Sequence, residues 1–195
     1  MLRTTKILIP ILMVLVFLGG IGAWDRLVNG KLNLNFGSYI PWGLWVGLYI
    51  YLVGLSGGAF LIVFLYHGLG IRSLRRASLY ALPLALTTIG AGLILVLADL
   101  GHMARFWKLY VQPSSTSLLA WMVWVYTAYI LVLLSMLYAL AKEKKGWLKP
   151  LSVVGFLLVI TFGGGEGALF GVLGAKPYWN SGLLPIRFLF SAFLS

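Results

Sequence analysis

The sequence contains no cysteine among its 195 residues, and only four of its residues are acidic. Without thiolates, the protein cannot ligate an iron–sulfur cluster in the usual way or build a disulfide framework. Charged residues make up 10 % of the composition, whereas they make up about 25 % of an average soluble domain. The composition therefore excludes an ordinary soluble domain.

Histidine is also scarce, since His67 and His102 are the only two. A bis-histidine haem needs both ligands at a similar depth in the membrane. The topology derived below puts the two histidines on opposite sides. We therefore expect any redox centre to be a diffusible molecule or to belong to another subunit.

Hydrophobic residues, in contrast, make up 61 % of the chain, and the mean hydropathy is +0.99. A helix needs roughly 20 apolar residues to cross a bilayer. Because lipid offers no hydrogen bonds to the backbone, such a stretch must be helical. The sequence therefore predicts an all-α integral membrane protein. The expected membrane helices cover residues 7–24, 41–66, 78–99, 118–141 and 150–173.

A sixth apolar segment begins near Gly182 and is still apolar at Ser195. Its fourteen residues would span only about 21 Å of a core roughly 30 Å thick. We therefore expect that the chain is incomplete or that a second polypeptide completes the fold. The expected domains are an N-terminal helix with its outer loop, a four-helix transmembrane bundle, and an outer loop with the start of a sixth helix. They cover residues 1–40, 41–174 and 175–195, respectively.

The distribution of Lys and Arg predicts the orientation of the helices. Nine of these residues lie at the N-terminus or in the loops after the second and fourth helices, and five lie in the alternate loops. The positive-inside rule then places the N-terminus in the cytoplasm and the loops 25–40, 100–117 and 174–181 outside. The first apolar run of about 18 residues exceeds the 7–15 of a signal-peptide core, which favours a retained helix over a cleaved signal.

Two acidic residues fall within the expected membrane helices. Asp99 ends the third helix, and Glu166 lies in the glycine-rich sequence TFGGGEGALFG of the fifth. A charge inside a membrane helix costs at least about 2.5 kcal/mol and usually faces a polar interior. The predicted topology places both carboxylates in the outer half of the bilayer. They are candidate proton-relay groups; alternatively, Glu166 pairs with Arg105 or Arg187 and locks the bundle.

The segment ADLGHMARFWKL follows the third helix and combines polar with aromatic residues. One interpretation is an aromatic belt at the membrane surface with a snorkelling arginine. The other is a site for a quinone head group. Such a site needs hydrogen-bond donors for two carbonyls, an apolar slot for the ring and a nearby proton exchanger. His102 and Arg105 would be the donors.

Three segments, in this order, carry a family resemblance. They are PWGLWVGLYIYLVGLSGGAFL, then ADLGHMARFWKL with its Pro-Ser-Ser-Thr-Ser turn, then EGALFGVLGAKPYWNSGLLP. Together they resemble the polysulfide reductase membrane-subunit family, also called NrfD-type, over roughly residues 39–195. The resemblance implies two consecutive four-helix bundles, the first formed here by the second to fifth helices. It also implies a quinone pocket near the outer surface of that first bundle.

The resemblance extends to individual residues. Asp99 and Arg105 match the family's Asp-Leu-Gly…Arg-Phe-Trp motif, and the sequence KPYWN matches its loop after the fifth helix. We expect the head group between the second, third and fifth helices. The candidate quinone-binding residues are Tyr39 and Trp42 as walls, His102 and Arg105 as donors, and Tyr178 and Asn180 from the outer loop.

The resemblance therefore implies a quinone-reactive subunit, of menaquinone or ubiquinone type, in the cytoplasmic membrane of a prokaryote. It would bind no haem or cluster itself and would be an enzyme only as part of a respiratory oxidoreductase complex. An iron–sulfur subunit on the outer face would exchange electrons with it, beside a molybdopterin or multihaem catalytic subunit. A purely structural membrane anchor and an ion or proton transporter remain alternatives. The nearly uncharged inner halves of the helices argue against the transporter.

Overall fold

The computed structural model describes residues 2–29, 43–100, 103–112, 114, 116–172 and 180–194. The chain divides into two compact units, Met1–Gly43 and Leu44–Ser195. The first unit contains helix α1 (Leu2–Asn29), which is longer at both ends than the expected 7–24. In its last turn, the Asn29 side-chain amide donates a hydrogen bond of 2.7 Å to Asp25 Oδ1. This contact supports the helix past the end of its apolar run.

The second unit is also helical, and no strand occurs among the residues that the structure describes. Its elements, in chain order, are α2 (Leu44–His67), η1 (Arg72–Leu74), α3 (Arg75–Asp99), η2 (Met103–Arg105), α4 (Lys108–Val111), α5 (Leu118–Ala141), α6 (Lys145–Gly171) and α7 (Leu184–Leu194). Together with α1, helices α2, α3, α5 and α6 are long and apolar enough to cross a membrane. The predicted all-α, multi-pass membrane protein is confirmed.

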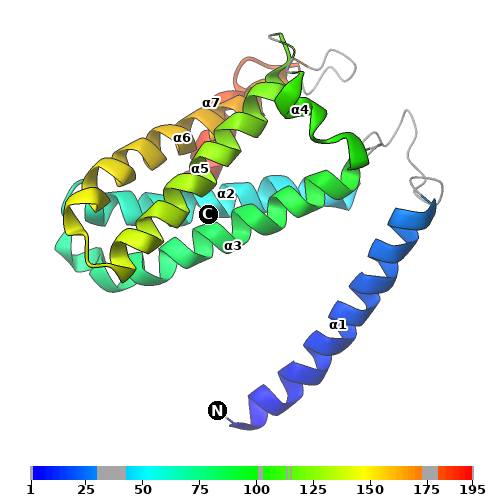
Figure 1. Ribbon diagram of the computed structural model, residues 1–195, viewed down its shortest axis with the longest axis horizontal. Coiled ribbons are helices and arrows are strands. Elements are labelled where there is room, and N and C mark those ends of the chain that lie inside the picture. Colours follow the sequence, from blue (N-terminus) through cyan, green and yellow to red (C-terminus); the bar gives the residue numbers. More distant parts are fainter. Residues whose placement is uncertain are drawn as a thin grey trace. The chain divides into compact units, whose positions relative to one another are not determined.

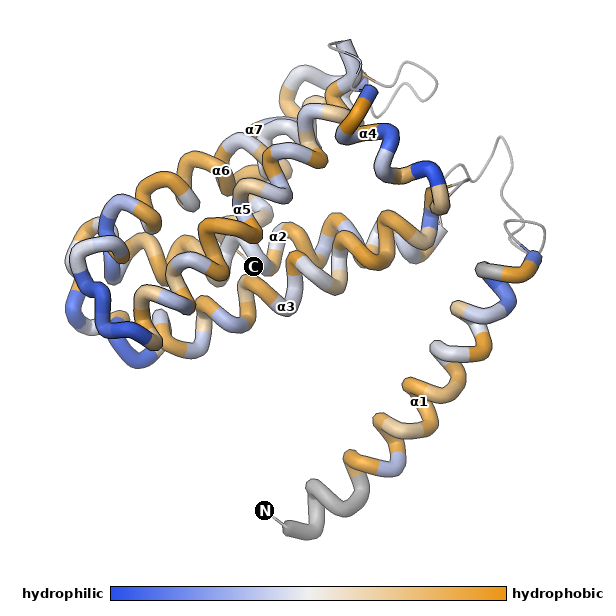
Figure 2. The backbone as a smooth tube through the Cα atoms, in the orientation of Figure 1, coloured by the Kyte–Doolittle hydropathy of each residue, from blue (hydrophilic) through white to orange (hydrophobic). Residues whose placement is uncertain are grey.

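Four long helices of the second unit form a bundle (Figure 1). Helices α2 and α3 make one antiparallel hairpin, and α5 and α6 make the other. Helix α2 packs on α6, α3 packs on α5, and the shorter α7 lies against both α2 and α6. Hydrophilic residues gather where α2 joins α3 and α5 joins α6 (Figure 2). We call this the basic end (residues 68–76 and 141–149), and the opposite end, with η2 and α4, the aromatic end.

The centre of the bundle is filled by interlocking aromatic rings. The rings of Phe60 and Tyr129 meet edge to face at 5.5 Å, and those of Tyr129 and Phe162 at 5.0 Å. All three side chains are fully buried. Gly155 lets α6 approach α2, because a Cβ at this position would overlap the Phe60 ring. The two hairpins are therefore held together by close packing, which lipid cannot replace.

Helices α2, α3 and α5 agree with the predicted spans to within three residues at each end, whereas α1 and α6 each begin five residues earlier than predicted. Helix α5 covers the predicted 118–141, and the Ser117 hydroxyl caps its start by accepting from the Ala120 N–H at 3.4 Å. Helix α6 begins at Lys145 rather than at Pro150. Pro150 therefore lies inside the helix, in its second turn.

Candidate functional site

A chain of hydrogen bonds joins three buried side chains in the interior of the bundle. The hydroxyl oxygens of Tyr49 on α2 and Tyr126 on α5 are 2.8 Å apart. The Tyr126 hydroxyl also donates to Glu166 Oε1 on α6. All three residues are buried, and Glu166 is only 4 % exposed. Three helices thus contribute one polar group each to a connected path.

These three residues lie at similar distances from the aromatic end. Tyr49 is five residues after the start of α2, and Glu166 is five residues before the end of α6. At 1.5 Å per residue, each lies about 8 Å from its helix end. Tyr126 is eight residues into α5, or about 12 Å along its axis. The path therefore lies within the apolar span but closer to the aromatic end.

Beside this path lies a cavity of about 250 Å³, which we call the α4 cavity. It is enclosed by α2, α3, α5 and the segment containing α4. Ten of its lining residues are apolar. The four polar ones are Tyr49, Tyr110, Tyr126 and Thr127. The cavity is therefore an apolar slot with hydroxyl groups at a few positions, two of which belong to the path to Glu166.

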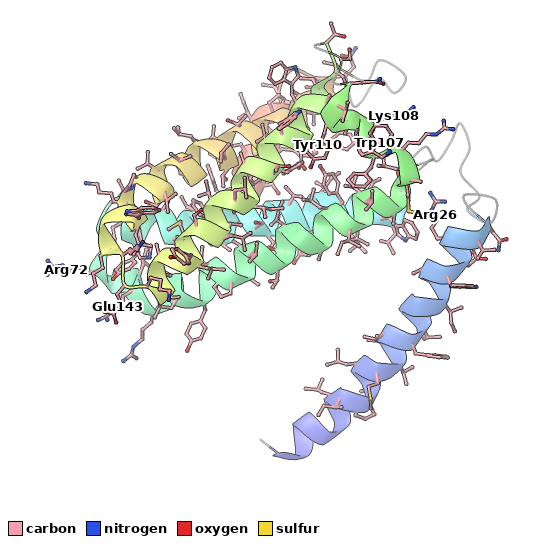
Figure 3. The ribbon with its side chains drawn as sticks, in the orientation of Figure 1. Arg26, Arg72, Trp107, Lys108, Tyr110 and Glu143 are labelled. Atoms are coloured by element: carbon pink, nitrogen blue, oxygen red, sulfur yellow. The ribbon has the colours of Figure 1, made fainter. Side chains whose placement is uncertain are left out.

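Helix α4 is fixed over this cavity by its own polar contact. The Tyr110 hydroxyl and Thr127 Oγ1 lie 2.8 Å apart, and the Tyr110 ring meets the Trp124 ring edge to face at 5.3 Å. Figure 3 shows Tyr110, Trp107 and Lys108 close together at the aromatic end. Lys108 Nζ lies 5.9 Å from the centre of the Trp107 ring. The short helix thus covers one side of the cavity.

Glu166 also borders a second cavity, of about 270 Å³, between α2, α6 and α7. We call it the α7 cavity. Arg187 lines the same space but is exposed. Within the described residues, no ion pair joins Glu166 to Arg187 or to Arg105. The structure therefore does not show the ion pair that was the alternative for Glu166. The carboxylate of Glu166 is instead hydrogen bonded to the Tyr126 hydroxyl.

The structure places the remaining predicted site residues separately. Arg105 lies in η2 at the aromatic end, and its side chain is exposed. Asn180 is exposed just before α7. Asp99 is half-buried at the end of α3 and does not line either cavity, although the adjacent Leu100 lines the α4 cavity. Four further residues fall outside the described part of the chain: Tyr39, Trp42, His102 and Tyr178.

Sequence reasoning missed the tyrosines of the path and of the α4 cavity. We expected the site between the second, third and fifth helices, which are α2, α3 and α6, but the α4 cavity is walled by α5 and connects to α6 only through Tyr126. A signal was present. A tyrosine hydroxyl within an apolar helix needs a hydrogen-bond partner, and Tyr126 lies eight residues into a membrane helix.

This arrangement can bind a flat, largely apolar molecule and move a proton. Pockets that hold whole drug-sized ligands are roughly 300–1,000 Å³, so the α4 cavity suits a smaller ring. The hydroxyl oxygens of Tyr49 and Tyr110, whose protons are donated to Tyr126 and Thr127, can accept hydrogen bonds from hydroxyl groups on the ring. The Tyr126 hydroxyl can also pass a proton to the carboxylate at Glu166 Oε1, because the two are already hydrogen bonded.

Comparison with known proteins gives a consistent result. Residues 32–195 match the family described as polysulphide reductase, NrfD. A selenate reductase subunit of Mesobacillus selenatarsenatis is 32 % identical over 97 % of this chain. A polysulfide reductase chain of Wolinella succinogenes is 30 % identical over 78 % of it. A menaquinone reductase integral membrane subunit of Nitratidesulfovibrio vulgaris is 23 % identical over 89 %.

The chain spans about half the length of these relatives. The matched region covers 54 % of the selenate reductase subunit, 54 % of the polysulfide reductase chain and 46 % of the menaquinone reductase subunit. No solved structure matches the chain significantly. The similarity thus concerns one half of proteins that are each, by name, one subunit or chain of an oxidoreductase.

Proposed function

Because the chain belongs to the NrfD polysulphide reductase family, we propose that it is a quinone- or quinol-reactive transmembrane subunit of a respiratory oxidoreductase. The observation that supports this most is the apolar α4 cavity beside the buried path from Tyr49 through Tyr126 to Glu166. The ring of a menaquinone- or ubiquinone-type molecule would occupy the cavity. Its isoprenoid tail would extend into lipid.

The residues of the cavity fit such a ring. The hydroxyl oxygens of Tyr49, Tyr110 and Tyr126 line the slot as acceptors for the two hydroxyl groups of a quinol, and most of the remaining lining is apolar. We also propose that Arg105 and Asn180 assist in binding the head group, together with four residues that lie outside the described part of the chain: Tyr39, Trp42, His102 and Tyr178. These loop residues remain part of the proposal.

Quinol oxidation releases two electrons and two protons, and the protein's own groups must accept the protons. The Tyr126 hydroxyl transfers its proton to Glu166 Oε1, to which it is already hydrogen bonded, and the Tyr126 oxygen takes up a proton from a quinol hydroxyl, either directly or through Tyr49. Glu166 then releases the proton toward the α7 cavity, which it also lines. Asp99, at the end of α3, is a second candidate acceptor near the surface.

The electrons would pass to a partner protein. We propose an iron–sulfur subunit on the outer face, bound to the aromatic end and to residues 176–181, with a molybdopterin or multihaem catalytic subunit beyond it. The names of the relatives support the existence of catalytic partners. The proposed location is the cytoplasmic membrane of a prokaryote, with the N-terminus in the cytoplasm. A complex whose iron–sulfur subunit binds the cytoplasmic face would overturn this arrangement.

The quinone site can be tested by filling the α4 cavity. Val123 lines it from α5, and Val123→Phe adds a ring inside the slot. The added ring takes up space that the quinone ring would occupy, so a short-chain menaquinone analogue should bind about tenfold more weakly or worse, a loss of about 1.4 kcal/mol. Binding is measured by quenching of the fluorescence of the eight tryptophans.

Leu131→Phe is the matched control, because Leu131 lies on the same helix but is 59 % exposed on its outer face. It should bind the analogue as the native protein does. Equal binding by the native protein and by the Val123→Phe variant would exclude this cavity as the quinone-binding site. No binding by any of the three proteins would favour the structural anchor instead.

A further inference from the structure

The largest of the cavities described lies at the basic end, away from the α4 cavity and from Glu166. It measures about 560 Å³ and is formed where α2 turns into α3 and α5 turns into α6. We call it the basic cavity. Figure 3 shows Arg72 and Glu143, which both line it, at this end of the bundle, opposite Tyr110. The proposed redox function makes no use of this space.

Four cations line the basic cavity, and they come from both hairpins. Arg72 and Arg75 belong to η1 and the start of α3, and Lys145 and Lys149 belong to the start of α6. Glu143 is the one carboxylate among the lining residues. The cavity therefore carries a net charge of +3, from four positive groups and one negative group, with His67 taken as neutral.

Neighbouring carboxylates do not neutralise these cations. In the part of the chain that the structure describes, none of the four forms an ion pair, and all four are exposed. Lys144, on the same turn, is engaged elsewhere, since its Nζ lies 5.1 Å from the centre of the Trp147 ring. Cations gathered around one space repel each other unless an anion joins them. The geometry therefore favours an anionic ligand with several oxygens.

Part of the lining of the same cavity is apolar. Leu79, Leu140 and Leu148 line it, and Leu79 is 53 % exposed on the outside of α3. Leu79 lies one turn further into α3 than Arg75, and Leu140 lies one residue before the end of α5. A free phosphate would interact with the cations but not with the leucines. A phospholipid presents a phosphate at this depth and hydrocarbon directly below it.

We propose that the basic cavity binds the head group of an anionic phospholipid. Arg75 and Lys149 contact its phosphate from opposite hairpins, and Leu79 contacts the first carbons of its acyl chains. Basic pockets between membrane helices are suited to such head groups. The bound lipid links α3 to α6 at an end of the bundle where no ion pair among the described residues does so.

The test is lipid titration of the purified protein in nonionic detergent, followed by native mass spectrometry. Phosphatidylglycerol should bind with a defined stoichiometry, and phosphatidylcholine should bind much more weakly. Each basic residue near a membrane surface contributes about 1 kcal/mol toward an anionic lipid. The double variant Arg75→Gln/Lys149→Gln should therefore bind phosphatidylglycerol about 30-fold more weakly.

The matched control is Arg76→Gln/Lys142→Gln. It removes the same charge from the same end, but neither residue lines the cavity. All four substituted side chains are exposed, so the bundle should stay folded in both variants. Retention of binding in the control supports the site. An equal loss in both variants would show attraction to charge alone and would overturn it, as would displacement of the lipid by an equal concentration of inorganic phosphate.

Discussion

Glu166 is a buried carboxylate that accepts a hydrogen bond from a tyrosine hydroxyl. Glu166→Gln keeps the size of the side chain and an oxygen that can accept from Tyr126, but it removes the titratable group. We expect normal assembly and a loss of quinone-linked turnover of roughly 10²–10⁴, the usual range for an acid–base group. The measurement is turnover per assembled complex, with the yield of complex determined in parallel.

Asp25→Asn is the control for this change, because it makes the same acid-to-amide substitution in the separate N-terminal unit. It should leave turnover near the native value. A lower yield of Glu166→Gln complex with unchanged turnover per complex would assign Glu166 a structural role. Unchanged turnover in both Glu166→Gln and Asp99→Asn would end the proton-relay proposal but not the quinone-site proposal.

Tyr126 joins the α4 cavity to Glu166, so its hydroxyl can be tested alone. Tyr126→Phe leaves the Glu166 carboxylate without its recorded donor, and a buried acceptor left unsatisfied costs about 1–3 kcal/mol. We expect slower turnover together with lower thermal stability. Tyr129→Phe is the control, because its hydroxyl contacts Ser56 at 3.2 Å and lies outside the path. It should lose stability by about 0.5–1.5 kcal/mol and keep its turnover. Equal turnover in both variants would contradict a relay through Tyr126.

At the scale of elements, the close contact between α6 and α7 determines the shape of the α7 cavity. A Cβ on Gly167 would overlap the backbone at Leu184 and Pro185, which cannot move as a flexible side chain does. Gly167→Ala should therefore destabilise the bundle by about 1–3 kcal/mol and displace α7. The measurement is thermal unfolding in detergent, with protease accessibility of α7 as a second readout.

Gly164 provides the matched substitution on the same helix. A Cβ there meets nothing within 4 Å, so Gly164→Ala should be neutral or stabilising by up to about 1 kcal/mol. If the two alanine variants unfold at the same temperature, the close approach of α7 is not a packing constraint.

At the scale of the whole molecule, orientation in the membrane can be tested simply because the protein has no cysteine. Ser114 is exposed at the aromatic end and Ser73 is exposed at the basic end. With the N-terminus inside, Ser114→Cys should react with an impermeant thiol reagent in intact cells, and Ser73→Cys should react only after lysis. The reverse pattern would place the aromatic end and the α4 cavity on the cytoplasmic side.

The order and extent of the helices could be predicted because they depend on local properties of the chain. Uninterrupted apolar runs of membrane length must be helical in lipid, whatever their neighbours are. Helix α5 therefore begins and ends where the sequence predicted. Helix α6 begins five residues earlier than predicted, at Lys145, so that Pro150 lies inside it.

Glu166 could also be identified as a candidate functional residue from the sequence alone, because a carboxylate within an apolar membrane helix is energetically costly and usually functional. The partner of that carboxylate was decided only by the tertiary structure. The sequence suggested an arginine as this partner, because residues of opposite charge can pair however far apart they lie in the sequence. The structure instead brings Tyr126 from α5 to Glu166 and Tyr49 from α2 to Tyr126. Which faces of three helices meet depends on how rings and glycines interlock in the core, and no single helix carries that information.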